Sequence, residues 1–416
     1  MSAQNAEDPG TGVDVRGIVA DGYEPVRDAF AANFQERGET GAALTVHREG
    51  RVVVDLWAGV KNTQPETAGD EGGLWQSGTA AVLRSASKGP AAAVLHLLHQ
   101  RGQLDLDAPV ATYWPEFKAN GKERVLVRHL LAHRAGLPVL DAPLTPARAV
   151  DGESGPSALA AQAPLWEPGT AHGYHAHTFS WLLGELVRRA TGRSLGRWFA
   201  EEVAGPLGLE MWFGLPARAR MDLARLAKVP TPDPPPAKGL RVRPKHVVTE
   251  AYRDPESLTR RAFDAIDPLP DENDRTYLAA GLPGSAGVAN ARSLSRFYAA
   301  LIGPLQDDPR TAGGMRGSGR RLFTPATLTQ ARSQESSGPD RVLVVNSRFG
   351  LGFMLHTSSA PMLAQGSFGH PGRGGSLAFA DPESATAFAY VTAAMQRSVT
   401  SDPRTHALVR ALRACG

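Results

Sequence analysis

The order of strand-like and helix-like segments along the chain constrains its fold more than any other feature. Residues 42–47 and 52–57 are apolar runs typical of strands, and the polar turn between them contains Gly50. Comparable patterns return only in the last part of the chain, at residues 351–355, 367–370, 376–380 and 386–391. The long stretch between is typical of helices and loops, and a final helix is expected at 404–414. Because strands at both ends of the chain share one sheet only if the two ends meet, the middle is expected to be an insertion.

These segments predict an α/β architecture of the α+β type, in which an antiparallel sheet is flanked by helices and a mostly helical domain is inserted. We expect residues 1–20 to be a disordered tail, residues 21–89 and 281–416 to form the α/β domain, and residues 90–280 to form the mostly helical domain. The proline-rich run 229–236 fits neither a helix nor a central strand, so it is expected to be a linker or a surface loop.

Charge and composition argue against several classes of function. The formal net charge is only +3, and no basic block is interleaved with aromatic residues, so nucleic acid is not an expected partner. No apolar run is long enough for a membrane span or a secretion signal, so we expect a cytoplasmic protein without a membrane partner. Cys415 is the single cysteine, which excludes an internal disulfide and a thiol-based site.

A serine and a lysine three residues apart are the first candidates for chemistry. Ser85 and Lys88 precede the apolar run 91–98, so they fall on one face of a helical first turn. A serine hydroxyl becomes a good nucleophile when a base accepts its proton, and a lysine with a lowered pKa can be that base. The unpaired N–H groups of the helix N-terminus add partial positive charge beside the serine. Since the pattern also fits a helix cap at Ser87 and a solvated lysine, it does not establish a catalytic site alone.

Two further stretches could complete such a site. Tyr174 lies in a turn before a helix expected at 179–190, where it could face a cleft, and a nearby lysine ammonium would lower its pKa. Residues 369–376 contain four glycines between two strand-like runs, which indicates a close approach of the backbone to another group. His370 in this stretch could donate a hydrogen bond near Tyr174 and the substrate. Alternatively, Tyr174 is a buried residue with one hydrogen bond, and the glycine-rich stretch is a tight hairpin with nothing bound.

Other patterns resemble functional sites but have simpler explanations. Two groups of histidines lie close together in the sequence: His172, His175 and His177, and His129 and His133. The first group lies on a turn without helical spacing or a nearby carboxylate, and the second has apolar neighbours, so we expect no metal site and no cofactor. The G-x-S-x-G run at 192–196 joins two helices, so Ser194 is expected to cap a helix.

Several segments in a fixed order carry a resemblance to a known family. Residues 85–88 match an S-x-x-K motif, residues 174–176 stand where Y-x-N is expected, and residues 370–372 stand where K-T-G is expected. Residues 129–138 are similar to the "LL-H-GLP" segment and residues 205–209 to the "PLGL" segment of that family. The chain thus resembles the serine β-lactamase and penicillin-binding-protein superfamily, in particular the class C β-lactamase-like esterases known as family VIII carboxylesterases. This resemblance implies a β-lactamase/transpeptidase-like fold.

The resemblance also implies a role for each matching residue. Ser85 would be the acylated nucleophile, Lys88 its base, and Tyr174 a partner in proton transfer. The N–H groups of Ser85 and Arg373 would form an oxyanion hole. The expected oxyanion and substrate-binding residues are therefore Ser85, His370, Gly372 and Arg373, and the further candidates for the cleft wall are His175 and Trp166. Ala176 replaces the asparagine of Y-x-N and His370 replaces the lysine of K-T-G, which argues against efficient β-lactam hydrolysis and leaves at most weak residual activity.

The sequence therefore predicts a serine hydrolase that acts on carboxylic esters of small molecules through an acyl-enzyme on Ser85. One alternative is a transacylase, an amide or ester synthase in which an amine or alcohol replaces water as the acceptor. A non-catalytic binding domain with the same fold and a metal-dependent hydrolase built on the three histidines are weaker alternatives. The oligomeric state and the natural acyl donor do not follow from the sequence.

Overall fold

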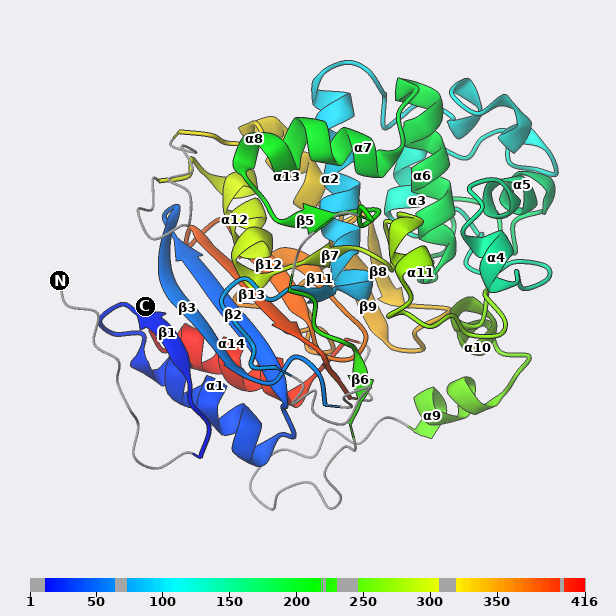
Figure 1. The fold of residues 1–416 in the computed structure, drawn as a ribbon. Coiled ribbons are helices and arrows are strands. Elements are labelled where there is room, and N and C mark those ends of the chain that lie inside the picture. Colours follow the sequence, from blue (N-terminus) through cyan, green and yellow to red (C-terminus); the bar gives the residue numbers. More distant parts are fainter. Residues whose placement is uncertain are drawn as a thin grey trace.

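The sheet that organises the molecule joins the two ends of the chain. The structure, a computed structural model, describes residues 12–63, 73–217, 219, 222–229, 246–306, 319–396 and 400–415. Within these residues the largest sheet has nine strands, all antiparallel, in the order β1–β3–β2–β13–β12–β11–β10–β9–β8 (Figure 1). Its strands are β1 (Arg16–Val19), β2 (Gly41–Arg48), β3 (Arg51–Gly59), β8 (Ser336–Pro339), β9 (Asn346–Phe349), β10 (Met354–Leu355), β11 (Phe368–Pro371), β12 (Leu377–Asp381) and β13 (Thr386–Thr392). The first and last parts of the chain meet where β2 pairs with β13.

The two faces of this sheet carry side chains of different size. Helix α12 (Ala291–Ile302) covers one face, and α1 (Glu24–Glu36) and α14 (Pro403–Arg413) cover the other (Figure 1). Along β13, Ala387 and Ala389 belong to the core under α12, whereas Phe388 and Tyr390 belong to the core under α1 and α14. Because successive residues of a strand point to opposite faces, small residues on one face let α12 pack closely against the sheet.

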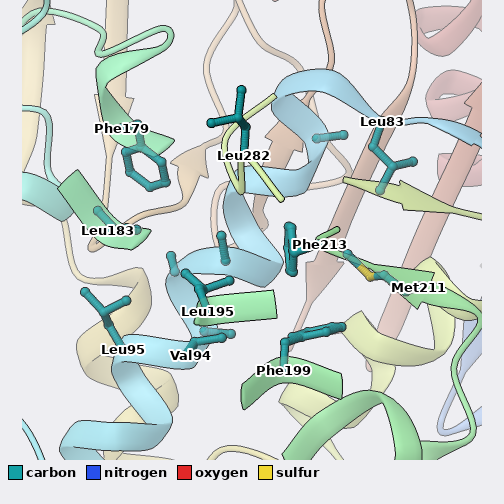
Figure 2. Close-up of a cluster of buried hydrophobic side chains, with 14 of the residues drawn as sticks. Leu83, Val94, Leu95, Phe179, Leu183, Leu195, Phe199, Met211, Phe213 and Leu282 are labelled. Carbon is teal, nitrogen blue, oxygen red and sulfur yellow. The ribbon is translucent and has the colours of Figure 1, made fainter. Parts of the chain in front are cut away.

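Helix α2 (Lys88–Gln100) is buried from Lys88 to Leu98. Helices α6 (Thr178–Thr191), α7 (Leu195–Phe199) and α13 (Pro325–Arg332) pack against it. Figure 2 shows Val94 and Leu95 of α2 among apolar side chains of α6 and α7. The helices outside the sheet layer are α3 (Val127–Leu131), α4 (Pro146–Ala149), α5 (Ser154–Ala161), α6 (Thr178–Thr191), α7 (Leu195–Phe199), α8 (Gly205–Leu207), α9 (His246–Arg253), α10 (Leu258–Phe263), α11 (Arg275–Ala279) and α13 (Pro325–Arg332). A helix enclosed on every side places its first residues, Lys88 included, inside the protein.

A small sheet fixes the chain immediately before α2. It has the order β4–β7–β5, formed by β4 (Ala81–Val82), β7 (Val288–Ala289) and β5 (Met211–Trp212). Two further short strands, β6 (Ala227–Lys228) and β14 (Ala394–Met395), pair in parallel. The N–H of Leu83 donates to the carbonyl of Gly287 at 2.8 Å, which continues the β4–β7 pairing up to the turn that carries Ser85.

The predicted fold, an antiparallel sheet flanked by helices with a mostly helical insertion, is confirmed, but three strands correct the prediction in detail. Residues 16–19 were expected in a disordered tail, and they form β1 because they pair with β3 at the sheet edge. Strands β8 and β9 were missed because their short sequences lack the alternation of apolar and polar residues, and pairing alone defines them. Residues 1–11 and 230–236 lie outside the described part of the chain. No helix among the described residues is long and apolar enough to cross a membrane.

Candidate active site

Ser85 lies at a sharp turn between β4 and α2. A short 3₁₀ segment, η1 (Arg84–Ser87), leads directly into α2, and Arg84 has a φ of +50°. A non-glycine residue in this left-handed region is strained and persists only where the surroundings hold it. Here the β4–β7 pairing holds one side and the buried α2 the other, so that the partly exposed Ser85 faces a cavity.

Lys88 is fully buried beside Ser85, with Nζ 3.3 Å from Ser85 Oγ. Nζ also donates to the carbonyl of Ala176 at 2.9 Å and to that of Gly284 at 2.7 Å. Burial lowers the pKa of Lys88 from its ordinary value of 10.5 to about 7, because the charged form loses its hydration. A neutral amine has two N–H bonds, which match the two carbonyls, and its lone pair then faces the serine hydroxyl.

Tyr174 lies against both residues, and its backbone is anchored by a buried carboxylate. Lys88 Nζ lies 5.0 Å from the centre of the Tyr174 ring, and the phenol interacts with the side chain of Ser85. The Tyr174 N–H donates to Asp340 Oδ1 at 3.0 Å, and the same oxygen accepts from the N–H groups of Val342 and Leu343. Asp340 therefore positions Tyr174, a role that nothing in the local sequence pattern indicated.

The pKa of Tyr174 shifts opposite to the sequence-based expectation. We expected the lysine ammonium to lower it, but burial raises it, and the nearby Asp340 adds to this effect. The expectation was wrong because the same burial that surrounds Tyr174 also lowers the pKa of Lys88 and removes much of its charge. Tyr174 is thus a neutral phenol at physiological pH, able to donate one proton and accept another.

His370 lines the same cavity and is a hydrogen-bond acceptor rather than the expected donor. Its Nδ1 lies 2.8 Å from the carbonyl oxygen of Pro371, which can only accept, so Nδ1 carries the proton. Burial, with the charge of Lys88, lowers the pKa of His370 to about 3 and keeps the ring neutral. Nε2 is therefore unprotonated, and it is buried without a hydrogen-bond partner among the described residues. The centre of the ring lies 5.8 Å from that of Tyr174.

The glycine-rich stretch brings the end of β11 against the Ser85 turn. A Cβ on Gly372 would stand 2.4 Å from the carbonyl oxygen of Leu83, so only glycine permits this approach. The residue that follows, Arg373, lines the cavity with Ser85. Within the described residues, neither the N–H of Ser85 nor that of Arg373 donates a hydrogen bond, so both are available to an oxygen atom in the cavity.

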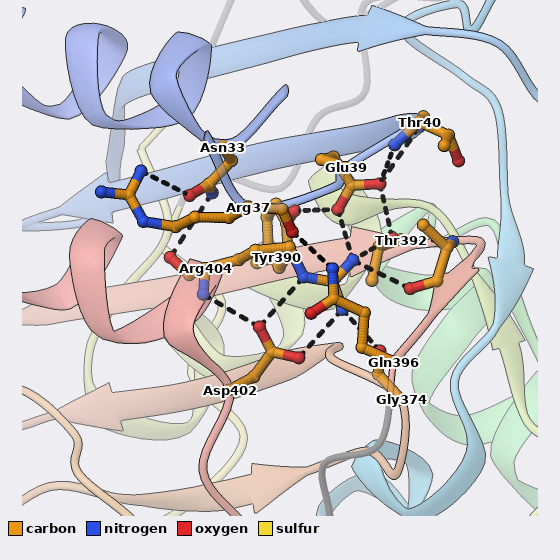
Figure 3. Close-up of polar contacts among 12 residues, drawn as sticks. Asn33, Arg37, Glu39, Thr40, Gly374, Tyr390, Thr392, Gln396, Asp402 and Arg404 are labelled. Atoms are coloured by element: carbon orange, nitrogen blue, oxygen red, sulfur yellow. Dashed lines mark hydrogen bonds and ion pairs between the residues drawn. The ribbon is translucent and has the colours of Figure 1, made fainter. Parts of the chain in front are cut away.

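A buried ion-pair network holds the glycine-rich loop at Gly374 in place (Figure 3). The guanidinium of Arg404 is fully buried, with Nη1 2.8 Å from Glu39 Oε2 and Nη2 2.9 Å from Asp402 Oδ2. Nη2 also donates to the carbonyl of Gly374 at 2.6 Å. This bond ties the loop after Arg373 to the C-terminal helix and to the loop before β2, which are far apart in the sequence.

The cavity is narrow and largely apolar. Its lining residues are Ser85, Tyr174, Phe263, Leu343, Met354, His370, Pro371, Arg373 and Thr400. The apolar walls, which come from three distant segments, were not predicted because no motif marks them. His175 and Trp166, the other candidates for the cleft wall, are not among these lining residues. Both ring nitrogens of His175 bond to backbone groups of Gly173 and Leu137, and Trp166 donates to the carbonyl of Ala171.

The sequence of this chain matches a known protein family over most of its length. The β-lactamase family matches residues 26–411, nearly the whole chain. The chain belongs to the β-lactamase family. The esterase/β-lactamase LipL from Mycobacterium tuberculosis is 34% identical over 390 residues, which cover 92% of this chain and 84% of LipL.

Solved structures agree with this membership. A family VIII carboxylesterase superposes with a TM-score of 0.81 at 34% identity, covering 97% of this chain and 100% of that one. EstA from Arthrobacter nitroguajacolicus Rue61a superposes with a TM-score of 0.79 at 31% identity, covering 96% and 97% of the two chains. The β-lactamase-like and carboxylesterase-like resemblance predicted from the motifs is therefore confirmed.

The Y-x-N motif of the family is altered in this chain. Ala176 stands in place of the asparagine of Y-x-N, and its backbone carbonyl, which needs no particular side chain, accepts from Lys88. The contact to the lysine that an asparagine side chain would provide is thus supplied by the main chain.

The histidines and the G-x-S-x-G serine that resembled functional sites in the sequence have ordinary structural contacts. His172 bonds to Ser347 at 3.0 Å, whereas His175 bonds to backbone groups, so these rings have separate partners. His133 is buried, its ring centre 5.0 Å from that of Tyr174, as expected of a core residue. The side chain of Ser194 accepts from the N–H of Arg197 and caps α7, as predicted.

Proposed function

We propose that this protein is a serine esterase that hydrolyses small carboxylic esters through an acyl-enzyme on Ser85. The observation that carries the proposal is the contact between Lys88 Nζ and Ser85 Oγ, made by a buried lysine whose pKa is about 7. A base with a pKa near the working pH is the most effective acceptor for the proton of a serine hydroxyl. The LipL and carboxylesterase relatives support the same class of reaction.

The proposed acylation step uses the cavity groups in order. Lys88 accepts the Ser85 hydroxyl proton while Oγ forms a bond to the ester carbonyl carbon. The N–H groups of Ser85 and Arg373 stabilise the negative charge that develops on the carbonyl oxygen. When the bond to the alcohol oxygen breaks, Tyr174 donates its proton to the departing alkoxide and is reprotonated by the Lys88 ammonium.

Deacylation repeats these transfers with water as the nucleophile. Water loses a proton to Lys88 as its oxygen bonds to the acyl carbon, and the bond to Ser85 Oγ breaks to release the carboxylic acid. Tyr174 then donates its proton to Ser85 Oγ and is reprotonated by the Lys88 ammonium. His370 lines the same cavity, and its Nε2, which has no hydrogen-bond partner among the described residues, is available to accept a hydrogen bond from the incoming water. Because the cavity is narrow and its walls include the apolar side chains of Phe263 and Leu343, a small acyl group fits the proposal best.

The proposal is tested by intact-protein mass spectrometry after mixing with p-nitrophenyl butyrate. We expect a transient butyryl adduct on the wild type and none on Ser85→Ala. Ser194→Ala is the matched control, because Ser194 also sits at a helix start but caps α7 away from the cavity. It should keep the adduct and the activity. Absence of any adduct on the wild type would refute the acyl-enzyme. An adduct that persists in water and is cleared only by an added amine or alcohol would refute hydrolysis in favour of acyl transfer.

A further inference from the structure

Arg373 places a positive charge at the cavity that contains the nucleophile. Its side chain is exposed, and the guanidinium carbon lies 5.1 Å from the centre of the Phe263 ring, which is itself a cavity wall. The same carbon lies 6.0 Å from the centre of the Tyr252 ring on α9. Within the described residues, Arg373 forms no ion pair with a carboxylate, and none of the residues that line the cavity is acidic.

Among the described residues, the neighbouring Arg84, unlike Arg373, has a carboxylate partner. Arg84 pairs with Glu272, and its Nη1 donates to the carbonyl of Arg373 at 3.2 Å. Burial lowers the pKa of Arg84 to about 10, and the charge of Arg373 contributes to this shift. Within the described residues, Glu272 pairs with Arg84, and no carboxylate pairs with Arg373.

The basic groups near the cavity also act on a buried histidine. Burial and then the charges of Lys88, Arg373 and Arg84 lower the pKa of His177 to about 3. Fields of one sign in a partly enclosed site raise the local concentration of ligands with the opposite charge. A guanidinium can also bind a carboxylate through two parallel hydrogen bonds, which adds geometric selectivity.

We propose that the Arg373 side chain binds an anionic group of the substrate, so that the preferred esters carry a carboxylate several bonds from the scissile carbonyl. This inference rests on the proposed esterase function, because the N–H of the same residue is assigned to the carbonyl oxygen. The main chain of Arg373 contacts the reacting carbonyl, and its side chain reaches the more distant part of the ester. The alternative is that the guanidinium only covers the rings of Phe263 and Tyr252 in a cation–π contact.

The experiment compares matched anionic and neutral esters on the same enzyme. On the acyl side, the mono-p-nitrophenyl ester of adipic acid is compared with p-nitrophenyl hexanoate. On the alcohol side, 3-carboxyphenyl butyrate is compared with phenyl butyrate. The readout is the ratio of kcat/KM for the anionic ester to that for its neutral partner. Because both values come from one variant, a general loss of activity cancels from the ratio.

The variants are Arg373→Gln, Arg373→Lys and the matched control Arg341→Gln. Arg341 is also an exposed arginine stacked on an aromatic ring, 5.1 Å from the centre of the Trp166 ring, but it does not line the cavity. For one of the two ester pairs we expect the ratio to fall about 10-fold in Arg373→Gln, mainly through KM, as for loss of a charge-assisted hydrogen bond. Arg373→Lys should retain part of the preference, and Arg341→Gln should retain all of it. The ratio of the wild type should also fall as sodium chloride is added.

Failure of this inference is distinguishable from failure of the proposed function. If the wild type hydrolyses neutral esters in a Ser85-dependent way but the ratios are equal in Arg373→Gln and wild type, the anion site is refuted and the esterase stands. If Arg341→Gln lowers the ratio as much as Arg373→Gln does, the effect is one of net charge and the site is also refuted. If Ser85→Ala hydrolyses all four esters as well as the wild type does, both proposals fail.

Discussion

The depressed pKa of Lys88 has a measurable consequence for protein stability as well as for activity. In the unfolded chain Lys88 has its ordinary pKa of 10.5, and in the folded protein its pKa is about 7. Between these values the unfolded state binds more protons than the folded state, so the free energy of unfolding rises with pH. The slope for one group in this interval is about 1.4 kcal/mol per pH unit.

Lys88→Met removes this titration and keeps a side chain of similar length. The wild-type free energy of unfolding, measured relative to Lys88→Met, should therefore increase by about 3 kcal/mol from pH 7 to pH 9.5. Between pH 5 and pH 7 the difference should change by less than about 0.5 kcal/mol, because both states of the wild type are then largely protonated. The bonds that the variant loses to Ala176 and Gly284 shift the curve as a whole but not its slope.

The assay is urea unfolding of both proteins at half-unit steps from pH 5 to pH 9.5. A difference that stays constant between pH 7 and pH 9.5 would show that Lys88 is charged in the folded protein, and the base assigned to Ser85 would be lost. The kinetic counterpart is an acidic limb in kcat/KM with a midpoint near pH 7, since only the neutral amine accepts the serine proton. If the limb lies instead near pH 5, a group other than Lys88 controls the reaction.

Three further substitutions test the site and its support. Gly284→Ala places a Cβ 3.2 Å from Lys88 Nζ, and we expect kcat to fall about 10-fold because the base is displaced. The control Gly184→Ala adds a Cβ that meets no atom within 4 Å, so kcat should stay unchanged. Tyr174→Phe removes the proton relay, so kcat should fall about 10²-fold or more with little change in KM in steady-state ester hydrolysis; an unchanged kcat would exclude the relay. Glu39→Gln breaks a fully buried pair with an arginine and should lower the free energy of urea unfolding by about 3 kcal/mol; a loss below about 0.5 kcal/mol would contradict the role of the network.

Local features of the site could be predicted from the sequence because they depend on neighbours within a turn. The spacing of Ser85 and Lys88 places both on one face of a helical turn wherever that helix packs. The cap at Ser194 and the turn of β2 into β3 depend likewise on a few adjacent residues. The order of strands and helices was sufficient to show that the chain ends share one sheet.

The chemical state of the site depended on tertiary structure. Burial sets the pKa values of Lys88 and Tyr174, and burial results from helices and strands that are remote in the sequence. The proton position on His370 depends on one carbonyl oxygen, and the anchor of Tyr174 is a carboxylate in a different segment, Asp340. The sequence by itself thus determined which residues could react and in which fold, because motifs and periodicity are local. Only the packed structure decided their charges, their partners and, among the described residues, the lack of an ion pair at Arg373, because desolvation and pairing depend on every element that surrounds the cavity.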